Sequence, residues 1–376
     1  MKKISLYSML LLAFIFSLTS CVDTTDPNPT SSKSLNLPDI PFAYSSEINI
    51  GTANAPIVIS NVNDENPDVT VFGATLGRVL FYDPALSLNN RVACASCHLQ
   101  EKAFADAGAH SIGFEGKITP RNSMAINNPV LNRTLFWDSR ATSATNLALQ
   151  PAQNHIEMGM EDLDYLAEKL QKIDYYPDLF EKAFGSGSFN NENISNALAQ
   201  FLCSMTTMNS KFDRVSKGED EFTSLEQLGN SIFLGRGKCN QCHAGSNFMA
   251  DDSPGGAYGG SSSSGEDIAG TANVGLDKFT KDQGKNNGSF RIPSLRNIAV
   301  TGPYMHDGRF EKLEDVIDFY SHNIQDHEDL DPKLSTNGQP IRFNFTELEK
   351  QALVAFLNTL TDQEYLTAEK YSSPFK

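Results

Sequence analysis

The sequence predicts an all-α fold built from two similar halves, and three observations support this prediction. Apolar residues recur at helical spacing in several segments. No segment alternates apolar and polar residues in the way a half-buried strand does. The pattern Cys-x-x-Cys-His occurs twice, once in each half of the chain. A motif that recurs in this way indicates two domains of the same kind in one polypeptide.

Three segments carry the helical pattern most clearly. The first stripe consists of Ile194, Leu198, Phe201, Leu202 and Met205. The second consists of Leu225, Leu228, Ile232 and Phe233, and Thr223 with Glu226 forms a capping box in front of it. The third consists of Leu348, Leu353, Phe356 and Leu360. Spacings of three and four residues place each set on one helix face, so we expect three amphipathic helices.

Length and charge exclude some classes of protein. The chain has 376 residues, which corresponds to one large domain or two of ordinary size. Apolar residues make up 40%, too many for a disordered chain. The net charge is −16, from 46 acidic and 30 basic side chains. This balance argues against a nucleic-acid-binding protein, which needs a basic face, and is compatible with a basic protein partner.

The N-terminus has the pattern of an export signal. A basic start is followed by an apolar run over residues 4–18, too short for a comfortable membrane span, and by small residues. Residues 18–21 read Leu-Thr-Ser-Cys, which resembles a bacterial lipobox, with Cys21 as the acylated mature N-terminus. The alternative is an ordinary signal peptide with an incidental cysteine. We expect a lipoprotein-type signal over residues 1–21, a flexible tether over 22–65 and a periplasmic, lipid-anchored protein.

Four of the six cysteines belong to the repeated motif. The two copies are Cys94-Ala-Ser-Cys97-His98 and Cys239-Asn-Gln-Cys242-His243. Cys-x-x-Cys-His is the attachment site of c-type haem. The two thiols add to the two vinyl groups of one porphyrin, and the adjacent histidine becomes an axial ligand of the iron. We therefore expect two covalently bound c-type haems.

Zinc binding and redox disulfides are the alternatives for a Cys-x-x-Cys pair. Structural zinc pairs usually lie much closer in sequence than these two motifs do. A redox disulfide does not explain the histidine that follows each pair. Cys203 belongs to neither motif, and we expect it to be a small buried apolar residue on a helix.

The two motifs divide the chain into two cytochrome c-like halves. We expect an N-terminal haem domain over residues 66–215 and a C-terminal haem domain over residues 216–376. The boundary falls in the charged and polar segment 211–221. Residues 253–289 are rich in Gly, Ser and Asn, which predicts a long loop inside the second half.

Further motifs flank the haem sites. Those in the first half are Leu-Gly-Arg-Val-Leu-Phe-Tyr-Asp-Pro at 76–84, Pro-Arg-Asn-Ser at 120–123, Phe-Trp-Asp-Ser-Arg at 136–140 and His-Ile-Glu-Met-Gly at 155–159. Those in the second half are Phe-Arg-Ile-Pro-Ser-Leu-Arg-Asn at 290–297 and Thr-Gly-Pro-Tyr-Met-His-Asp-Gly at 301–308. In this order and spacing they resemble the bacterial di-haem cytochrome c peroxidase and MauG family, over roughly residues 70–360.

The resemblance implies different roles for the two haems. A haem with two strong ligands only passes electrons, whereas one with an open side can bind peroxide. The N-terminal haem, with His98 as proximal ligand, would be the low-potential peroxidatic centre. The C-terminal haem, with His243, would be the centre where electrons enter.

The resemblance also assigns five further residues. Trp137, the only tryptophan in the chain, matches the tryptophan between the haems, and a core anchor is the alternative. Glu157 matches the distal glutamate that assists O–O cleavage, and a solvated side chain is the alternative. Asn122, with the main-chain carbonyls of Thr301 and Pro303, matches a calcium site, and an oxygen-only ligand set suits Ca²⁺. For Asn122, Thr301 and Pro303 the alternative is a side-chain cap and a loop that bind no ion.

Departures from the family pattern concern the peroxidatic side. Many members have a histidine in a Ser-Ile-Gly-His stretch that caps the iron at rest, whereas residues 111–114 here read Ser-Ile-Gly-Phe. Phe114 cannot ligate iron, so we expect an open or water-bound iron. His110 is an alternative ligand, but it lies four residues before the position of the family's histidine. Leu147 stands where a glutamine often borders the distal pocket, which leaves more of the proton transfer to Glu157 and water.

A further departure concerns the C-terminal haem, whose usual sixth ligand is a methionine. The matching position here is Tyr320, at the end of an i, i+3, i+4, i+7 stripe that begins at Leu313 and faces the interior. MauG has a tyrosine ligand there. A tyrosinate favours ferric iron, so it would lower the potential of this haem relative to methionine. If Tyr320 is a core residue, the alternative ligands are Met305, His306 and His322.

The sequence therefore predicts a cytochrome c peroxidase that reduces hydrogen peroxide with electrons from a small cytochrome c or cupredoxin. The acidic surface would attract a basic donor, and salt would weaken this attraction. A MauG-like oxidase acting on a protein or organic substrate is the first alternative, and a non-catalytic electron carrier is the second. The family also implies a homodimer.

Overall fold

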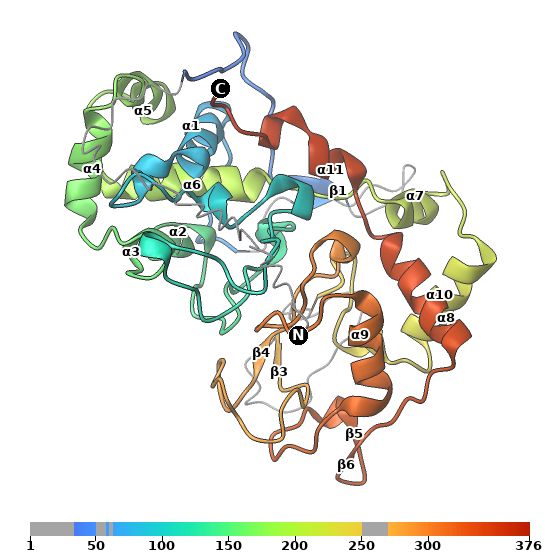
Figure 1. Cartoon of the computed structure of the whole chain (residues 1–376). Coiled ribbons are helices and arrows are strands. Elements are labelled where there is room, and N and C mark those ends of the chain that lie inside the picture. Colours follow the sequence, from blue (N-terminus) through green and yellow to red (C-terminus); the bar gives the residue numbers. More distant parts are fainter. Residues whose placement is uncertain (1–33, 50–57, 60–62, 250–269) are drawn as a thin grey trace, which may run out of the picture. The chain divides into compact units, whose positions relative to one another are not determined.

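The computed structural model describes residues 34–49, 58–59, 63–249 and 270–376, which form a helix-rich structure (Figure 1). The described residues make one compact unit. The predicted signal over residues 1–21, with Cys21, and the part of the predicted loop up to residue 269 lie outside the described residues. In the described part, no helix is both long enough and apolar enough to cross a membrane.

Helices dominate the described residues, and strands are short. The α-helices are α1 (Val71–Tyr82), α2 (Ala144–Ala148), α3 (Gln150–Gln153), α4 (Leu163–Gln171), α5 (Tyr176–Phe184), α6 (Asn191–Ser204), α7 (Lys211–Lys217), α8 (Ser224–Leu234), α9 (Leu313–Asp318), α10 (Glu347–Asn358) and α11 (Gln363–Thr367). The strands form three antiparallel pairs, β1 (Ile48–Asn49) with β2 (Val58–Ile59), β3 (Thr271–Ala272) with β4 (Phe290–Arg291), and β5 (Ser335–Thr336) with β6 (Gln339–Pro340). The helix-rich character that the sequence predicts is confirmed.

The three predicted amphipathic helices correspond to α6, α8 and α10. All five apolar residues of the first stripe are buried. The capping box at the start of α8 is also present, because the Thr223 side chain accepts a hydrogen bond from the Glu226 backbone. Leu225, Leu228 and Leu348 are exposed, however, so only the later residues of the second and third stripes pack inward.

Each of two helix pairs crosses at a glycine. α1 packs against α6, and α8 packs against α10. A Cβ atom on Gly77 would lie 1.9 Å from the carbonyl oxygen of Ala197, and one on Gly229 would lie 1.9 Å from that of Ala352. Any larger residue would therefore force the two backbones apart. The same close crossing thus builds both halves of the chain.

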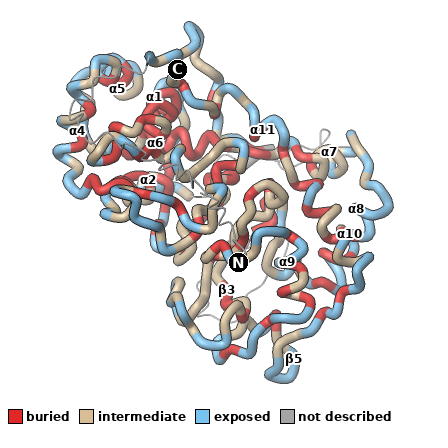
Figure 2. The backbone as a smooth tube through the Cα atoms, in the orientation of Figure 1, coloured by how far each residue is buried: buried red, intermediate tan, exposed pale blue. Residues whose placement is uncertain are grey.

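Two hydrophobic clusters make up the core, and Figure 2 shows buried residues along the helices that form them. The first cluster contains buried residues of α1, α4, α5 and α6, and the second contains those of α8, α9 and α10. Tyr365 and Tyr371, near the C-terminus, belong to the first cluster. Tyr44 and Ile48, inside the stretch expected to be a tether, are buried in it too. The domain boundary near residue 215 stays a prediction.

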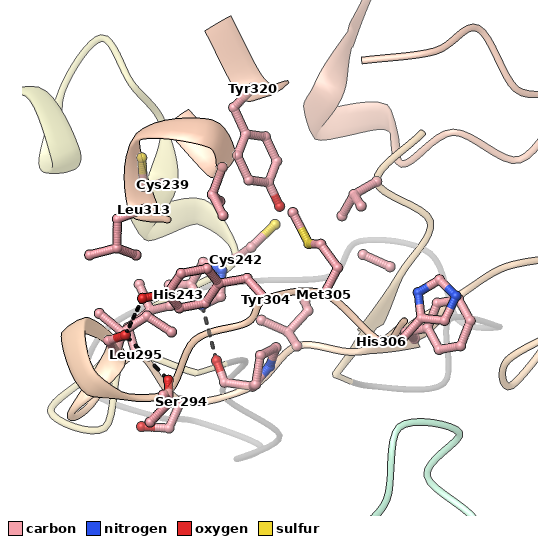
Figure 3. A pocket seen from close by; sticks show the side chains of 18 of the residues that line it. Cys239, Cys242, His243, Ser294, Leu295, Tyr304, Met305, His306, Leu313 and Tyr320 are labelled. Carbon is pink, nitrogen blue, oxygen red and sulfur yellow. Dashed lines mark hydrogen bonds between the residues drawn. The ribbon is translucent and has the colours of Figure 1, made fainter. Parts of the chain in front are cut away.

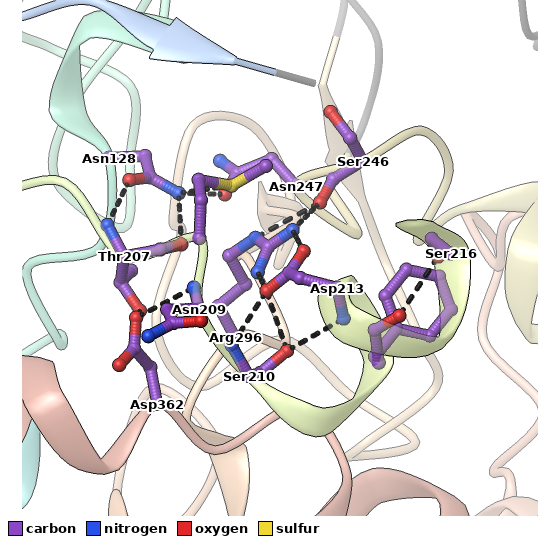
Figure 4. Close-up of polar contacts among 12 residues, drawn as sticks. Asn128, Thr207, Asn209, Ser210, Asp213, Ser216, Ser246, Asn247, Arg296 and Asp362 are labelled. Carbon is purple, nitrogen blue, oxygen red and sulfur yellow. Dashed lines mark hydrogen bonds and ion pairs between the residues drawn. The ribbon is translucent and has the colours of Figure 1, made fainter. Parts of the chain in front are cut away.

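A buried ion pair joins Asp213, on α7, to Arg296 (Figure 4). Two nitrogens of the fully buried Arg296 each donate to the carboxylate of Asp213 at 2.9 Å. The Ser210 hydroxyl donates to the same carboxylate at 2.7 Å, and Arg296 Nε donates to the Ser246 carbonyl at 3.0 Å. Burial raises the pKa of Asp213, but the attraction and hydrogen bonds of Arg296 outweigh it, so the pKa lies below its ordinary value.

Side-chain amides extend this network. Asn127 Nδ2 donates to the Arg296 carbonyl at 2.8 Å, and Asn297 Nδ2 donates to Asn127 Oδ1 at 3.0 Å. Asn128 receives the Thr207 backbone N–H at 2.7 Å and donates to Asn247 Oδ1 at 2.9 Å. These buried amides connect four segments that are distant in sequence. Loss of one amide would therefore leave hydrogen-bonding groups of the other segments without partners.

The ion pair leads to a stability prediction. Asp213→Asn leaves the buried guanidinium of Arg296 without its charged partner, which should lower the free energy of unfolding by about 3–5 kcal/mol. Equilibrium unfolding in guanidinium chloride measures this loss. The matched control is Asp220→Asn, because Asp220 pairs with Arg214 at the surface. The control should change stability little, and equal effects of the two substitutions would contradict the assigned role of the buried pair.

Candidate active site

The first Cys-x-x-Cys-His motif folds as a short 3-10 helix, η2 (Cys94–Ser96), and the turn that follows. The His98 backbone N–H donates to the Cys94 carbonyl at 3.1 Å. His98 Nδ1 lies 2.6 Å from the Phe104 carbonyl oxygen. A carbonyl only accepts, so Nδ1 carries the proton and Nε2 is free to bind iron. Burial lowers the pKa of His98 and keeps the imidazole neutral, as a metal ligand must be.

The second motif repeats this arrangement in the 3-10 helix η6 (Cys239–Gln241). His243 Nδ1 lies 3.2 Å from the Phe248 carbonyl oxygen and 3.1 Å from the Pro293 carbonyl oxygen. Burial lowers the pKa of His243 to about 4, so this imidazole is also neutral. Both motifs therefore present a neutral histidine with Nε2 available, and both fit a c-type haem.

The two alternatives for the cysteines find no support. The five cysteines of the described segments are all free thiols, so neither Cys-x-x-Cys pair forms a disulfide. Among the described residues, no group of three His, Cys, Asp or Glu side chains is arranged to hold a metal ion. Cys203 is fully buried in α6, as expected of a small apolar residue.

A cavity with mainly apolar walls lies beside the second motif (Figure 3). Cys239, Cys242 and His243 line it, and aliphatic side chains such as Leu295 and Leu313 form its walls. Apolar walls with a few convergent polar groups are typical of cofactor sites. The cavity thus suits a porphyrin attached at Cys239 and Cys242.

Tyr320 lies in a π-helical turn, η8 (Phe319–Asn323), which continues α9. Its side chain lines the cavity, and Figure 3 shows its hydroxyl pointing inward. Burial raises the pKa of Tyr320 well above its ordinary value. Single π-turns within helices occur frequently at functional sites. The stripe that begins at Leu313 correctly predicts that Tyr320 faces the interior.

The alternative ligands occupy different positions. His322 is exposed. His306 stacks on Phe290 with ring centroids 3.8 Å apart and planes 13° apart, and Figure 3 shows it away from His243. Met305 lines the same cavity as Tyr320. All three of Tyr320, Met305 and His306 therefore line the cavity, but the His306 ring is stacked on Phe290.

Trp137 is held along the same cavity by residues from both halves of the chain. Its indole Nε1 donates to the Asn122 carbonyl at 2.9 Å. Its own carbonyl accepts the backbone N–H of Arg291, on β4, at 2.7 Å. Its ring meets Phe290 edge to face, with centroids 6.4 Å apart. Trp137 belongs to a motif of the first half, so these contacts bring it to the haem site of the second.

Arg121 makes a further link between the halves that the sequence did not reveal. Its guanidinium forms two hydrogen bonds with Asp282, at 2.6 and 2.7 Å, and one with Asp138 at 2.7 Å. These bonds raise the pKa of Arg121. The motif at residues 120–123 marks Arg121, but Asp282 lies too far along the chain for any spacing to pair them.

Asn122, Thr301 and Pro303 all line this cavity. Asn122 Nδ2 donates to the carbonyls of Gly108 and Ala109 at 3.2 Å, so its amide oxygen is the group left for a cation. The three residues of the expected calcium site therefore border one cavity, and the calcium site stays a prediction.

Glu157 lies near the first motif. Burial raises the pKa of the Cys94 and Cys97 thiols, and the negative charge of Glu157 raises it further. Asn154 Nδ2 donates to Glu157 Oε1 at 2.9 Å. Burial raises the pKa of Glu157 above its ordinary value. A half-buried carboxyl with this pKa is suited to proton transfer.

Phe114 packs directly against the Glu157 segment. Its backbone N–H donates to the carbonyls of Ile156 and Glu157 at 2.8 and 2.9 Å. Gly159 has a φ of +70°, and a Cβ there would lie 2.8 Å from the Phe114 ring. His110, the alternative ligand, is exposed. Leu147 packs against the first hydrophobic cluster.

Comparisons with known proteins agree with this geometry. The family model for di-haem cytochrome c peroxidase matches residues 72–221. The methylamine utilization protein MauG of Methylophilus methylotrophus is 31% identical over 298 residues, which cover 78% of this chain and 84% of that protein. Cytochrome c551 peroxidase of Nitrosomonas europaea is 33% identical over 325 residues, which cover 83% and 86%. The chain belongs to the di-haem cytochrome c peroxidase family.

A solved structure of this kind is also similar. It is a MauG-like protein associated with microbial copper homeostasis, with a TM-score of 0.72 and 30% identity, covering 84% of this chain and 96% of that one. Membership of the di-haem peroxidase family implies two c-type haems. The resemblance inferred from the motifs is therefore confirmed.

Proposed function

We propose that this protein reduces hydrogen peroxide to water with electrons delivered one at a time by a small cytochrome c or cupredoxin. The observation that carries the proposal is the position of Glu157, a half-buried carboxyl near the Cys94–His98 motif. Peroxide cleavage needs a group at this place that takes up and returns a proton. The similarity to a cytochrome c551 peroxidase supports peroxidase chemistry in general.

In this proposal His98 and His243 hold the two irons, and the adjacent cysteine pairs hold the rings. When bound, the haems supply the redox equivalents that break the O–O bond. Tyr320 serves as the second ligand at the His243 site. Trp137, hydrogen-bonded to the backbones of Asn122 and Arg291, lies on the path of electrons between the two sites.

Glu157 takes a proton from one peroxide oxygen and returns it to the other. Asn154 holds Oε1 at 2.9 Å, which orients the carboxylate and leaves Oε2 for the substrate. Phe114 offers no ligand atom, so peroxide meets no displaceable side chain of this segment. The protein therefore needs no ligand exchange at residue 114 before peroxide binds.

Glu157→Gln should slow the reaction with peroxide by about 10²–10⁴-fold, because glutamine cannot exchange a proton. Stopped-flow absorbance of the di-haem protein measures this rate. Glu161→Gln is the matched control, since Glu161 is exposed nearby in sequence, and it should react at the original rate.

The pH dependence gives a second readout of the same group. Glu157 accepts a proton only when ionised, and burial raises its pKa. The rate should therefore fall as the pH drops through this raised pKa, above the range of an ordinary glutamate. Glu157→Gln should abolish this dependence. An unchanged rate and pH profile in the variant would remove Glu157 from the mechanism.

A tyrosinate at the second iron would stabilise its ferric state. Tyr320→Phe should therefore raise the reduction potential of this haem, as measured by spectroelectrochemistry. Met305→Leu serves as the comparison, because Met305 faces the same cavity. If Met305→Leu alters the spectrum and potential while Tyr320→Phe does not, the ligand is Met305.

We also propose a calcium ion at Asn122 and the carbonyls of Thr301 and Pro303, supported by their gathering around one cavity. Export to the periplasm and a homodimer stay predictions. The lipid anchor stays one too, since Cys21 lies outside the described residues. The acidic net charge supports a basic donor protein.

A MauG-like oxidase is the second candidate, and Tyr320 together with Phe114 favours it. Such an enzyme would remove electrons from a protein or organic substrate. The similarity to MauG of Methylophilus methylotrophus supports this reading equally.

One experiment separates the candidates. The purified di-haem protein is mixed with peroxide and a reduced small cytochrome c, and both spectra are followed. We expect rapid oxidation of the cytochrome. A long-lived change in the enzyme spectrum with little cytochrome oxidation would instead support the oxidase. No response to peroxide would leave an electron carrier.

A further inference from the structure

One buried carboxylate in the first half of the chain holds two tyrosine hydroxyls. Asp83 ends α1 and is only 5% exposed. Tyr175 donates its hydroxyl proton to Asp83 Oδ2 at 2.6 Å, and Tyr176 donates to the same oxygen at 2.8 Å. Oδ1 accepts the Ala85 backbone N–H at 2.8 Å. Short hydrogen bonds to an ionised carboxylate are about twice as strong as neutral ones.

Other tyrosines in the described part bond differently. Five of them donate their hydroxyl to a backbone carbonyl, namely Tyr44, Tyr82, Tyr304, Tyr365 and Tyr371. A carboxylate is a much stronger base than a carbonyl oxygen, so it can take up the proton that a phenol releases on oxidation. Tyr175 and Tyr176 are therefore the pair whose phenols have a built-in proton acceptor. Loss of an electron from a phenol is coupled to loss of its proton, so this acceptor favours oxidation.

The pair lies between the first haem-binding motif and the surface. α1 contacts both η2, which carries Cys94, and α5, which carries Tyr176. Tyr176 is buried in the first hydrophobic cluster, and Cys94 packs against the same cluster. Tyr176 is fully buried, whereas Tyr175 is half-exposed. Their ring centroids are 4.7 Å apart, so the two phenols form a short path outward.

We propose that Tyr176 and Tyr175 form a redox relay that carries oxidising equivalents from the first haem to the surface, with Asp83 as the proton acceptor. The inference rests on the proposed peroxide chemistry. The surface reductant that it fits is a small phenol or aromatic amine, which gives up single electrons. The relay provides a route out of the first haem that does not pass through Trp137.

Each step of the relay balances. Tyr176 would give one electron to the oxidising equivalent that peroxide leaves at the first haem site, and its phenolic proton would move to Asp83. Tyr175 then gives one electron to Tyr176, while Asp83 returns its proton to Tyr176 and takes the proton of Tyr175. The surface reductant finally gives one electron to Tyr175, and Asp83 returns the proton. Asp83 and both tyrosines are then restored.

Freeze-quench electron paramagnetic resonance of the full di-haem protein, mixed with peroxide without a reductant, tests the relay. The wild type should show a tyrosyl radical, identified by the change in its spectrum on ring-deuteration of tyrosine. Tyr176→Phe should lose this signal. Asp83→Asn should also lose it, although both tyrosines remain, because the amide cannot accept the proton.

Tyr82→Phe is the matched control. Tyr82 packs against the same hydrophobic cluster and donates a hydrogen bond of 2.6 Å, but to the Tyr371 carbonyl. It should keep the radical. Tyr175→Phe should also keep a radical, trapped on Tyr176, and should lose peroxide-dependent oxidation of an added phenol such as guaiacol. Unfolding midpoints of all variants confirm that each is folded.

The outcomes separate the relay from the proposed function. If the wild type consumes peroxide and oxidises cytochrome c but shows no tyrosyl radical, the relay is wrong and the peroxidase stands. The relay is equally wrong if folded Tyr176→Phe keeps the signal. If the wild type does not react with peroxide at all, the proposed function fails, and the relay fails with it.

Discussion

The buried ion pair between Arg296 and Asp213 anchors the segment that bonds both Trp137 and the second haem-binding motif. A fully buried guanidinium must keep its carboxylate, because an unpaired buried charge is costly. The segment that leads to Arg296 also bonds the site residues, since Arg291 donates to the Trp137 carbonyl and the Pro293 carbonyl accepts from His243. Fixing Arg296 therefore fixes the position of Trp137 relative to the second motif.

The two halves share local structures but differ in the residues that do chemistry. Both cross two helices at a glycine, and both bond the histidine Nδ1 of their motif to a phenylalanine carbonyl. The bridges Leu135–Ala141 and Tyr304–Phe310 also close similar loops, each with an Asp–Arg ion pair two residues apart. The first loop carries Trp137 where the second carries His306. One scaffold thus serves two sites with different side chains.

The first haem site combines two kinds of carboxylate. Glu157 is half-buried and accepts a hydrogen bond from one amide, that of Asn154. Asp83 is almost fully buried and accepts hydrogen bonds from two phenols. The difference follows from what surrounds each carboxylate, because the side-chain chemistry of aspartate and glutamate is nearly the same.

The sequence alone determined the helix-rich fold and the family, and it predicted the haem attachment sites, since these depend on local spacing and on short motifs. It also indicated through the family where Trp137 and Glu157 belong. Tertiary structure decided the contacts between segments that are distant in sequence. Three contacts join segments that are far apart in the chain. They are the Arg121–Asp282 pair, the hydrogen bonds of Tyr175 and Tyr176 to Asp83, and the packing of Tyr44 in the first cluster. Such contacts form only when packing brings the segments together, so a linear pattern carries no signal for them.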